Sequence, residues 1–225
     1  MPLALFDVDG TLTTEHTWKA LMVGFAHHGL KRATHRGFLA VHYPLYMLHK
    51  LGLVSQERFR RVWAGDLAWY FRGLTPAALA PVLHTAVDYL AQHWRAAGVA
   101  RLQQHLDQGD PVVLVSAAPE PLLRAVGQAL GVAHVVGTRP EMRQGRYTGR
   151  TVPPVCIGRH KAARARAYAE AQGWPVDWST AYAYADAISD LDLLEMVGHP
   201  VAVAPDPALA AIARERGWEV VTDSA

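Results

Sequence analysis

The chain has 225 residues, of which 51% are hydrophobic and 19% are charged, a balance typical of a soluble globular protein with a sizeable core. A formal net charge of +2, from 22 basic and 20 acidic residues, gives no electrostatic basis for binding nucleic acid. Its start has no basic region followed by a long apolar stretch, so we expect no signal peptide or membrane span, and a cytoplasmic location. The single cysteine, Cys156, can form no internal disulfide.

The first predicted element is a buried strand over residues 3–6, which are all apolar. Asp7 and Asp9 follow it two residues apart, so along an extended chain both carboxylates point the same way. Gly10 then permits a tight change of chain direction. Alone, these residues could be ordinary turn formers, so the rest of the chain must decide between a turn and a site.

Residues 15–94 are predicted to be helical throughout. Apolar residues recur at three- and four-residue spacing after residue 15, and Ser55, Thr75 and Pro76 are typical helix-start residues. Pro44 is expected to kink or break its helix. The expected helices are 15–28, 31–50, 56–71 and 75–94.

From about residue 95, helices alternate with apolar, β-branched strands, a pattern that indicates a mostly parallel sheet covered on both faces. The expected fold class is α/β, with a Rossmann-like core of residues 1–14 and 95–225 and an inserted helical cap of residues 15–94. The elements expected after the cap are helices 99–108, 119–131, 159–172, 189–197 and 207–215, strands 112–115, 132–136, 181–185, 201–203 and 218–221, and a hairpin at 141–149.

Polar residues stand at the ends of several predicted strands or at the starts of the helices that follow. Singly, each has an ordinary explanation as a turn hydroxyl, a solvated lysine or a helix cap. Together they match phosphoryl transfer through an aspartyl phosphate, which needs a carboxylate nucleophile, a proton donor, a divalent cation and phosphate-binding groups. These residues are Asp7, Asp9, Ser116, Lys161, Asp186 and Asp190.

The carboxylates divide into reacting and metal-binding groups. Asp7 is predicted to attack phosphorus, while Asp9 protonates the leaving oxygen and later takes a proton from water. Asp7, the backbone carbonyl of Asp9 and Asp186 would form an oxygen-rich Mg2+ site. Asp190 would support that site, either through metal-bound water or by orienting the lysine.

The phosphate group needs positive charge and hydrogen-bond donors. Ser116 and the amide groups after it, beginning with Ala117, are predicted to bind the phosphate, and Lys161 to pair with both the nucleophile and the phosphate. Gly10 and Thr11 are further candidate contacts in the first loop.

The chain resembles the haloacid dehalogenase-like (HAD) superfamily of phosphatases. The matching stretches, in the family's order, are Asp7-Val8-Asp9-Gly10-Thr11-Leu12-Thr13, Val113-Leu114-Val115-Ser116, Lys161 and Ala185-Asp186-Ala187-Ile188-Ser189-Asp190. Because the helical insert follows the first motif directly, the resemblance is to the phosphoserine-phosphatase-like branch (subfamily IB), whose cap is a helical bundle. The resemblance implies Mg2+ and hydrolysis of small phosphomonoesters.

Two stretches depart from the family pattern. Ala185, Ala187 and Ser189 replace the glycines and the asparagine that relatives commonly carry in the last motif, although both aspartates are kept. Ala117 and Ala118 stand where phosphoserine phosphatases often have glycines. Extra methyl groups beside the metal and the phosphate predict a narrower site.

Substrate choice is expected to lie in the cap. Phosphoserine phosphatases hold the ends of the amino acid with a cap glutamate and arginine, and Glu15, His16 and Arg61 are the loosely matching residues. Because the glutamate is displaced by one position, a different amine-bearing substrate or a larger one fits the pattern. Ordinary surface charges are the competing explanation for Glu15 and Arg61.

Four cap histidines recur every seven residues, at 28, 35, 42 and 49. Seven helical residues rise about 10.5 Å, too far for neighbours in the series to share one ion. The same region holds the most membrane-like stretch, 37–53, which is too short and too polar to span a bilayer and predicts a buried or interfacial helix.

Three alternatives remain open from the sequence. The same covalent intermediate could pass phosphate to an acceptor other than water, or an apolar cap face could admit a lipid or lysophospholipid phosphate. A phosphate-sensing protein of the receiver type would also use an aspartate and a lysine, but Asp9 argues against a long-lived acyl phosphate. The sequence does not decide the natural substrate, whether phosphoserine, an amino-alcohol phosphate or another metabolite, or the oligomeric state.

Overall fold

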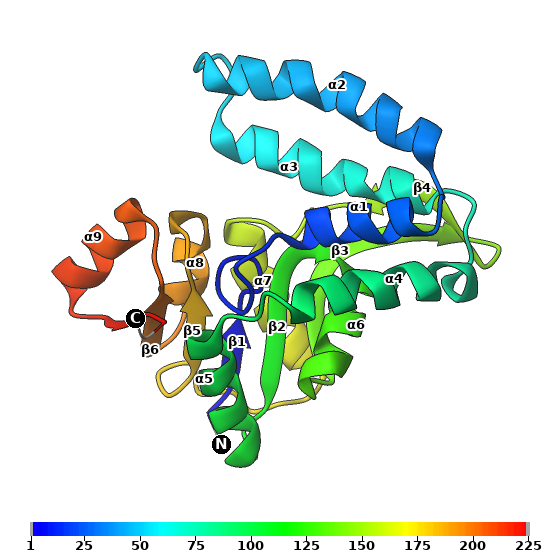
Figure 1. Ribbon diagram of the computed structural model, residues 1–225. Helices are drawn as coiled ribbons and strands as arrows, with labels where there is room; N and C mark the ends of the chain where they lie inside the picture. The colour runs from blue at the N-terminus through cyan, green and yellow to red at the C-terminus, as the bar shows by residue number, and fades with distance from the viewer. Residues whose placement is uncertain (1, 224–225) are drawn as a thin grey trace.

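A seven-stranded sheet runs through the described part of the chain, residues 2–223 of a computed structural model (Figure 1). The strands are β1 (Ala4–Phe6), β2 (Val112–Pro119), β3 (His134–Arg143), β4 (Arg146–Val152), β5 (Tyr182–Ala185), β6 (His199–Val203) and β7 (Glu219–Val221). Their order is β4-β3-β2-β1-β5-β6-β7, and only the β3–β4 pair is antiparallel. The predicted α/β class and mostly parallel sheet are confirmed.

The strand that carries Asp7 lies at the centre of this sheet. Phe6 of β1 is in register with Leu114 of β2 on one side and with Tyr184 of β5 on the other. All three strands are parallel, so the segments that follow them leave the sheet at one edge. The strand order therefore brings together three stretches that are far apart in the sequence.

Helices cover both faces of the sheet, because the strands are apolar on both sides. The helices are α1 (Thr17–His27), α2 (Arg32–Lys50), α3 (Gln56–Asp66), η1 (Leu67–Phe71), α4 (Pro76–Ala91), α5 (Ala96–Asp107), α6 (Glu120–Leu130), α7 (Arg159–Ala171), η2 (Ile188–Asp190), α8 (Leu191–Leu194) and α9 (Pro207–Arg216). One buried cluster joins the sheet to α5, α6 and the helices before them. A second joins the opposite face to α7, α8 and α9.

The helices between β1 and α5 stack above one side of the sheet (Figure 1). α1 packs against α4, α2 against α3, and η1 against β4. The Ser55 and Thr75 side chains cap α3 and α4 as predicted, by accepting hydrogen bonds from Arg58 N and Ala78 N. The division into a core and a cap at residues 14 and 95 stays a prediction.

Several predicted bounds need correction. Of the kink or break expected at Pro44, the break is wrong, because α2 continues through this residue, which has no backbone N–H to donate. The single helix expected over 56–71 ends at Asp66 and continues as the tighter turn η1, whose apolar side chains are mostly buried. β3 runs on to Arg143, where it forms the predicted hairpin with β4. Within residues 2–223, no helix is both long and apolar enough to cross a membrane.

Helix α5 packs closely against the loop after β1 at Gly98, and a substitution there tests this contact. A Cβ at Gly98 would lie 2.1 Å from the Thr11 carbonyl oxygen, so Gly98→Ala should lower the free energy of unfolding by about 1–3 kcal/mol. Gly37 in α2 is the matched control, since a Cβ there meets nothing within 4 Å. Gly37→Ala should raise stability by about 0.5–1 kcal/mol. Urea denaturation measures both, and an unchanged midpoint for Gly98→Ala would contradict the packing.

Candidate active site

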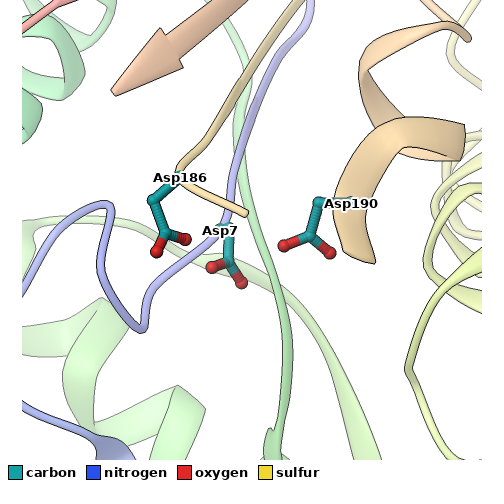
Figure 2. A group of neighbouring side chains, drawn as sticks. All are labelled: Asp7, Asp186 and Asp190. Carbon is teal, nitrogen blue, oxygen red and sulfur yellow. The ribbon is translucent and has the colours of Figure 1, made fainter. Parts of the chain in front are cut away.

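Three carboxylates converge where β1 and β5 end. Asp7 follows β1, Asp186 follows β5, and Asp190 closes η2 just beyond it. Figure 2 shows their side chains turned toward one another, and one oxygen from each lies within 4.8 Å of the others. The structure therefore assembles the predicted acidic cluster from two neighbouring strand ends.

A buried lysine joins two of these carboxylates. Lys161 Nζ, from the first turn of α7, lies 2.6 Å from Asp7 Oδ1 and 2.6 Å from Asp190 Oδ1. Burial alone would lower the pKa of Lys161, but the two carboxylates raise it above its usual value, so the ammonium stays charged. Burial raises the pKa of Asp7 well above its usual range, and the Lys161 charge opposes that shift.

The loop after β1 is shaped around Asp186. Gly10 has φ +88°, and a Cβ there would lie 2.0 Å from Asp186 Oδ2, so both the backbone conformation and the space require glycine. Thr11 Oγ1 donates a weak 3.4 Å hydrogen bond to Asp186 Oδ1. Gly10 and Thr11 thus pack against Asp186 of the acidic cluster.

The chemistry of this cluster fits a hard divalent cation. Carboxylate oxygens are the ligands that Mg2+ prefers. Burial, followed by the negative charge of Asp190, raises the pKa of Asp186 to about 6, and a bound cation would offset that crowding of like charges. Asp7, Asp186 and Asp190 are therefore the side chains that could hold the metal.

Asp9 lies apart from this group and turns toward the helical segment. Its Oδ1 accepts a 2.7 Å hydrogen bond from Thr17 N, and its Oδ2 accepts one of 2.9 Å from Thr17 Oγ1. Burial raises the pKa of Asp9, while these hydrogen bonds oppose the rise. Asp9 therefore caps α1 from across the loop, in a place where His16, the residue before the helix, offers no cap of its own.

Ser116 lies inside β2 rather than after it, because the strand extends to Pro119. Its side chain is buried, and Oγ accepts a 3.2 Å hydrogen bond from Ala118 N. Ser116 and Ala117 face the same cavity as the acidic cluster. A hydroxyl and backbone amide groups are thus available on the side of Asp7 opposite β5.

The cluster opens into a cavity of about 500 Å³ between the sheet edge and the helices above it. Its sheet side is polar, and its helical side is largely aromatic and apolar. The sheet side includes Asp7, Asp9, Ser116, Ala117, Ala118, Lys161, Asp186, Ala187, Ser189 and Asp190, and the helical side includes His16, Thr17, Trp18, Leu39, His42, Tyr43, Tyr46, Phe59, Arg60, Trp63 and Leu67.

The residues predicted to set specificity fall in different places. His16 lines the cavity, whereas Glu15 pairs with Lys19 at 2.7 Å and Arg61 pairs with Glu57 on the exposed face of α3. Neither Glu15 nor Arg61 is among the residues that line the cavity.

The arginine that reaches the cavity is Arg60, whose Nη1 donates a 2.7 Å hydrogen bond to Ser189 Oγ. The sequence could point to this region only through its arginine-rich stretch, which does not show whether Arg60 or Arg61 reaches the cavity. Arg60 thus connects α3 to the motif in which Ser189 departs from the family pattern.

The four regularly spaced histidines do not form a common site, and the thiol of Cys156 is buried. His28, His35, His42 and His49 hydrogen-bond to separate partners, namely Thr85, Tyr70, Asp66 and the Val54 carbonyl. Burial raises the pKa of the Cys156 thiol to about 11, so it is protonated at neutral pH.

Comparisons with known sequences agree with this geometry. A model of the family described as haloacid dehalogenase-like hydrolase matches residues 4–195. Phosphoserine phosphatase SerB1 of Mycobacterium tuberculosis is 33% identical over 220 residues, which cover 96% of this chain and 69% of that protein. A histidinol-phosphatase of Neisseria meningitidis serogroup C is 28% identical over 225 residues, 97% of each chain.

Solved structures share the fold. A Bordetella pertussis protein of unknown function superposes with a TM-score of 0.80 at 27% identity, over 97% of both chains. A substrate-bound phosphoserine phosphatase gives a TM-score of 0.61 at 17% identity, over 93% of this chain and 89% of the other. The predictions of a phosphatase and of the phosphoserine-phosphatase-like branch are confirmed. The chain belongs to the haloacid dehalogenase-like hydrolase family.

Proposed function

We propose that the chain is a Mg2+-dependent phosphomonoester hydrolase that works through an aspartyl-phosphate intermediate. The observation that carries the proposal is the buried Asp7 at the floor of the cavity, ion-paired with Lys161 and flanked by Asp186 and Asp190. A carboxylate, a fixed positive charge and an acidic metal site within one small volume are the parts that such a transfer needs.

In the first half-reaction, a carboxylate oxygen of Asp7 attacks the phosphorus, and the bond between phosphorus and the ester oxygen breaks. Asp9 gives its proton to the leaving oxygen, which departs as an alcohol. Lys161, the Ser116 hydroxyl and the Ala117 amide bind the phosphoryl oxygens, with Gly10 and Thr11 bordering them.

In the second half-reaction, water attacks the phosphorus of the aspartyl phosphate and the bond to the Asp7 oxygen breaks. Asp9 accepts the proton from that water, which restores both carboxyl groups and releases inorganic phosphate. Asp7, Asp186 and Asp190, with the Asp9 carbonyl, would hold Mg2+, which neutralises charge on the phosphoryl oxygens. Transfer to an added alcohol in place of water is the phosphotransferase alternative, and product analysis separates the two.

A small phosphorylated metabolite with an amine group, such as phosphoserine or an amino-alcohol phosphate, is the favoured substrate class. Support comes from the names of two relatives, a phosphoserine phosphatase and a histidinol-phosphatase. In the cavity, Arg60 could pair with the carboxylate of a phosphorylated amino acid, and a ring nitrogen of His16 could accept a hydrogen bond from an amine. A lipid phosphate is the second candidate, because Trp18, Tyr43 and Phe59 make the helical wall of the cavity aromatic.

The nucleophile is tested by Asp7→Asn. An amide cannot form the acyl phosphate, so release of phosphate from p-nitrophenyl phosphate should fall at least about a thousandfold. Asp107→Asn, on the exposed end of α5, is the matched control and should keep full activity. Circular dichroism checks that both variants fold. Substantial turnover by folded Asp7→Asn would exclude Asp7 as nucleophile.

The metal site is tested by Asp186→Asn and a thermal melt. Mg2+ should raise the melting temperature of the wild-type protein by about 3 °C or more, because it binds only the folded cluster. Asp186→Asn removes one crowded negative charge, so the metal-free variant should melt higher than metal-free wild type while losing most of the Mg2+ response. Asp192→Asn, an exposed neighbour, should respond to Mg2+ as wild type does. An equal response in all three proteins would place the metal elsewhere.

Specificity is tested by two adjacent arginines. Arg60→Gln should lower kcat/KM at least about tenfold on the best substrate from a panel of phosphorylated amino acids, amino alcohols, sugars, nucleotides and lysophospholipids, because the cavity loses a charged donor. Arg61→Gln, which removes a surface pair with Glu57, should change it less than twofold. A larger loss of kcat/KM for Arg61→Gln than for Arg60→Gln would show that Arg61, and not Arg60, contacts the substrate.

A further inference from the structure

One part of the surface is unusually apolar. Nine of the twelve exposed large hydrophobic side chains in residues 2–223 lie between residues 30 and 53, on α2 and the turns that flank it, and the other three are Met142, Val152 and Val220. Val41, Leu51 and Leu53 are exposed at 52%, 69% and 72%. We call residues 30–53 the α2 surface. So dense an apolar patch marks a surface that another body covers.

The charge of this surface has one sign. No Asp or Glu occurs between Glu15 and Glu57, whereas Lys31, Arg32, Arg36 and Lys50 stand at the two ends of α2. An exposed apolar helix face with basic residues at both ends is typical of helices that lie in the interface of an anionic membrane. Tyr43 and Tyr46 add side chains with an apolar body and a polar tip, which suit the same interface.

The position of α2 leaves this face free. α2 is the outermost helix in Figure 1 and lies on α3, away from the sheet. Its inner side is filled by Phe38 and His42, which are fully buried. The apolar side chains on the outer side of α2 are therefore exposed and are not covered by another element of the described chain.

A second copy of the chain is a poorer occupant on electrostatic grounds. If two α2 helices paired antiparallel about a twofold axis, Arg32 and Arg36 of one copy would face Lys50 of the other. Parallel pairing would bring identical basic ends together. With no acidic residue on the α2 surface, either arrangement places like charges in contact, whereas anionic lipid headgroups complement them.

We propose that the α2 surface binds the surface of an anionic lipid bilayer. The apolar side chains enter the headgroup region, while the basic residues at the helix ends pair with lipid phosphates. Leu39, Tyr43 and Tyr46 line the active-site cavity and are also exposed, so docking brings that side of the cavity to the membrane. This binding is independent of the proposed reaction.

Sedimentation with vesicles tests the proposal on the full chain. Wild-type protein should sediment with vesicles of phosphatidylcholine and phosphatidylglycerol, and much less with phosphatidylcholine alone or at high salt. Val41→Ser/Leu51→Ser/Leu53→Ser should weaken binding at least about tenfold. Arg36→Gln/Lys50→Gln should weaken it about fivefold for each charge removed.

Matched variants elsewhere serve as controls. Met142→Ser/Val152→Ser/Val220→Ser and Arg150→Gln/Arg214→Gln alter exposed side chains outside the α2 surface and should bind as wild type does. Hydrolysis of p-nitrophenyl phosphate in the absence of vesicles should stay within about twofold of wild type for all four variants, which shows that they fold.

Three results would overturn the proposal. The first is wild-type protein that stays in solution with anionic vesicles, and the second is equal binding by the triple serine variant of the α2 surface. The third is a wild-type dimer in analytical ultracentrifugation that this same variant converts to monomer, since the occupant would then be a second copy. A failure of the proposed hydrolase shows instead as absent phosphate release, with vesicle binding unchanged.

Discussion

The pairing of Lys161 with Asp7 and Asp190 is the interaction on which the site depends. All three side chains are buried, and a buried charge without a partner costs several kcal/mol. With Asp186 included, three carboxylates face one ammonium group, so the fully ionised cluster carries two negative charges. Such a cluster favours a proton or a divalent cation. Burial, followed by the negative charge of Asp190, raises the pKa of Asp186 in the same direction.

The sequence predicted this cluster well because parallel strands impose their own geometry. Asp7, Ser116 and Asp186 belong to β1, β2 and β5 or follow them, and the order β2-β1-β5 makes these strands neighbours. Once the strands are recognised from their apolar runs, their carboxyl ends must meet at one edge. Gly10 was predicted for its backbone freedom, and the structure adds a second reason, the closeness of Asp186.

The helical segment was harder to predict because the phase of each helix decides what a side chain reaches. One residue along a helix turns the side chain by about 100°, so Arg60 enters the cavity while Arg61 stays outside. Glu15 and His16 precede α1, so the course of the loop after β1, not a helix phase, decides that His16 lines the cavity and Glu15 does not. The positions at which helices end also depend on packing. α2 continues through Pro44, whereas α3 ends before Leu67 and the chain tightens there into η1.

Asp9 connects these two parts of the molecule. Its carboxylate caps α1 through both hydrogen bonds to Thr17, and the same turn supplies His16, Thr17 and Trp18 to the cavity wall. In the proposed mechanism Asp9 must exchange a proton with substrate oxygen, and leaving Thr17 would cost the cap about 1 kcal/mol. A substrate that packs against His16 and Trp18 can offset that loss. Proton transfer by Asp9 then depends on correct binding of the substrate against the helical wall. Substrate selection by the helices is thereby linked to the reaction at the sheet edge.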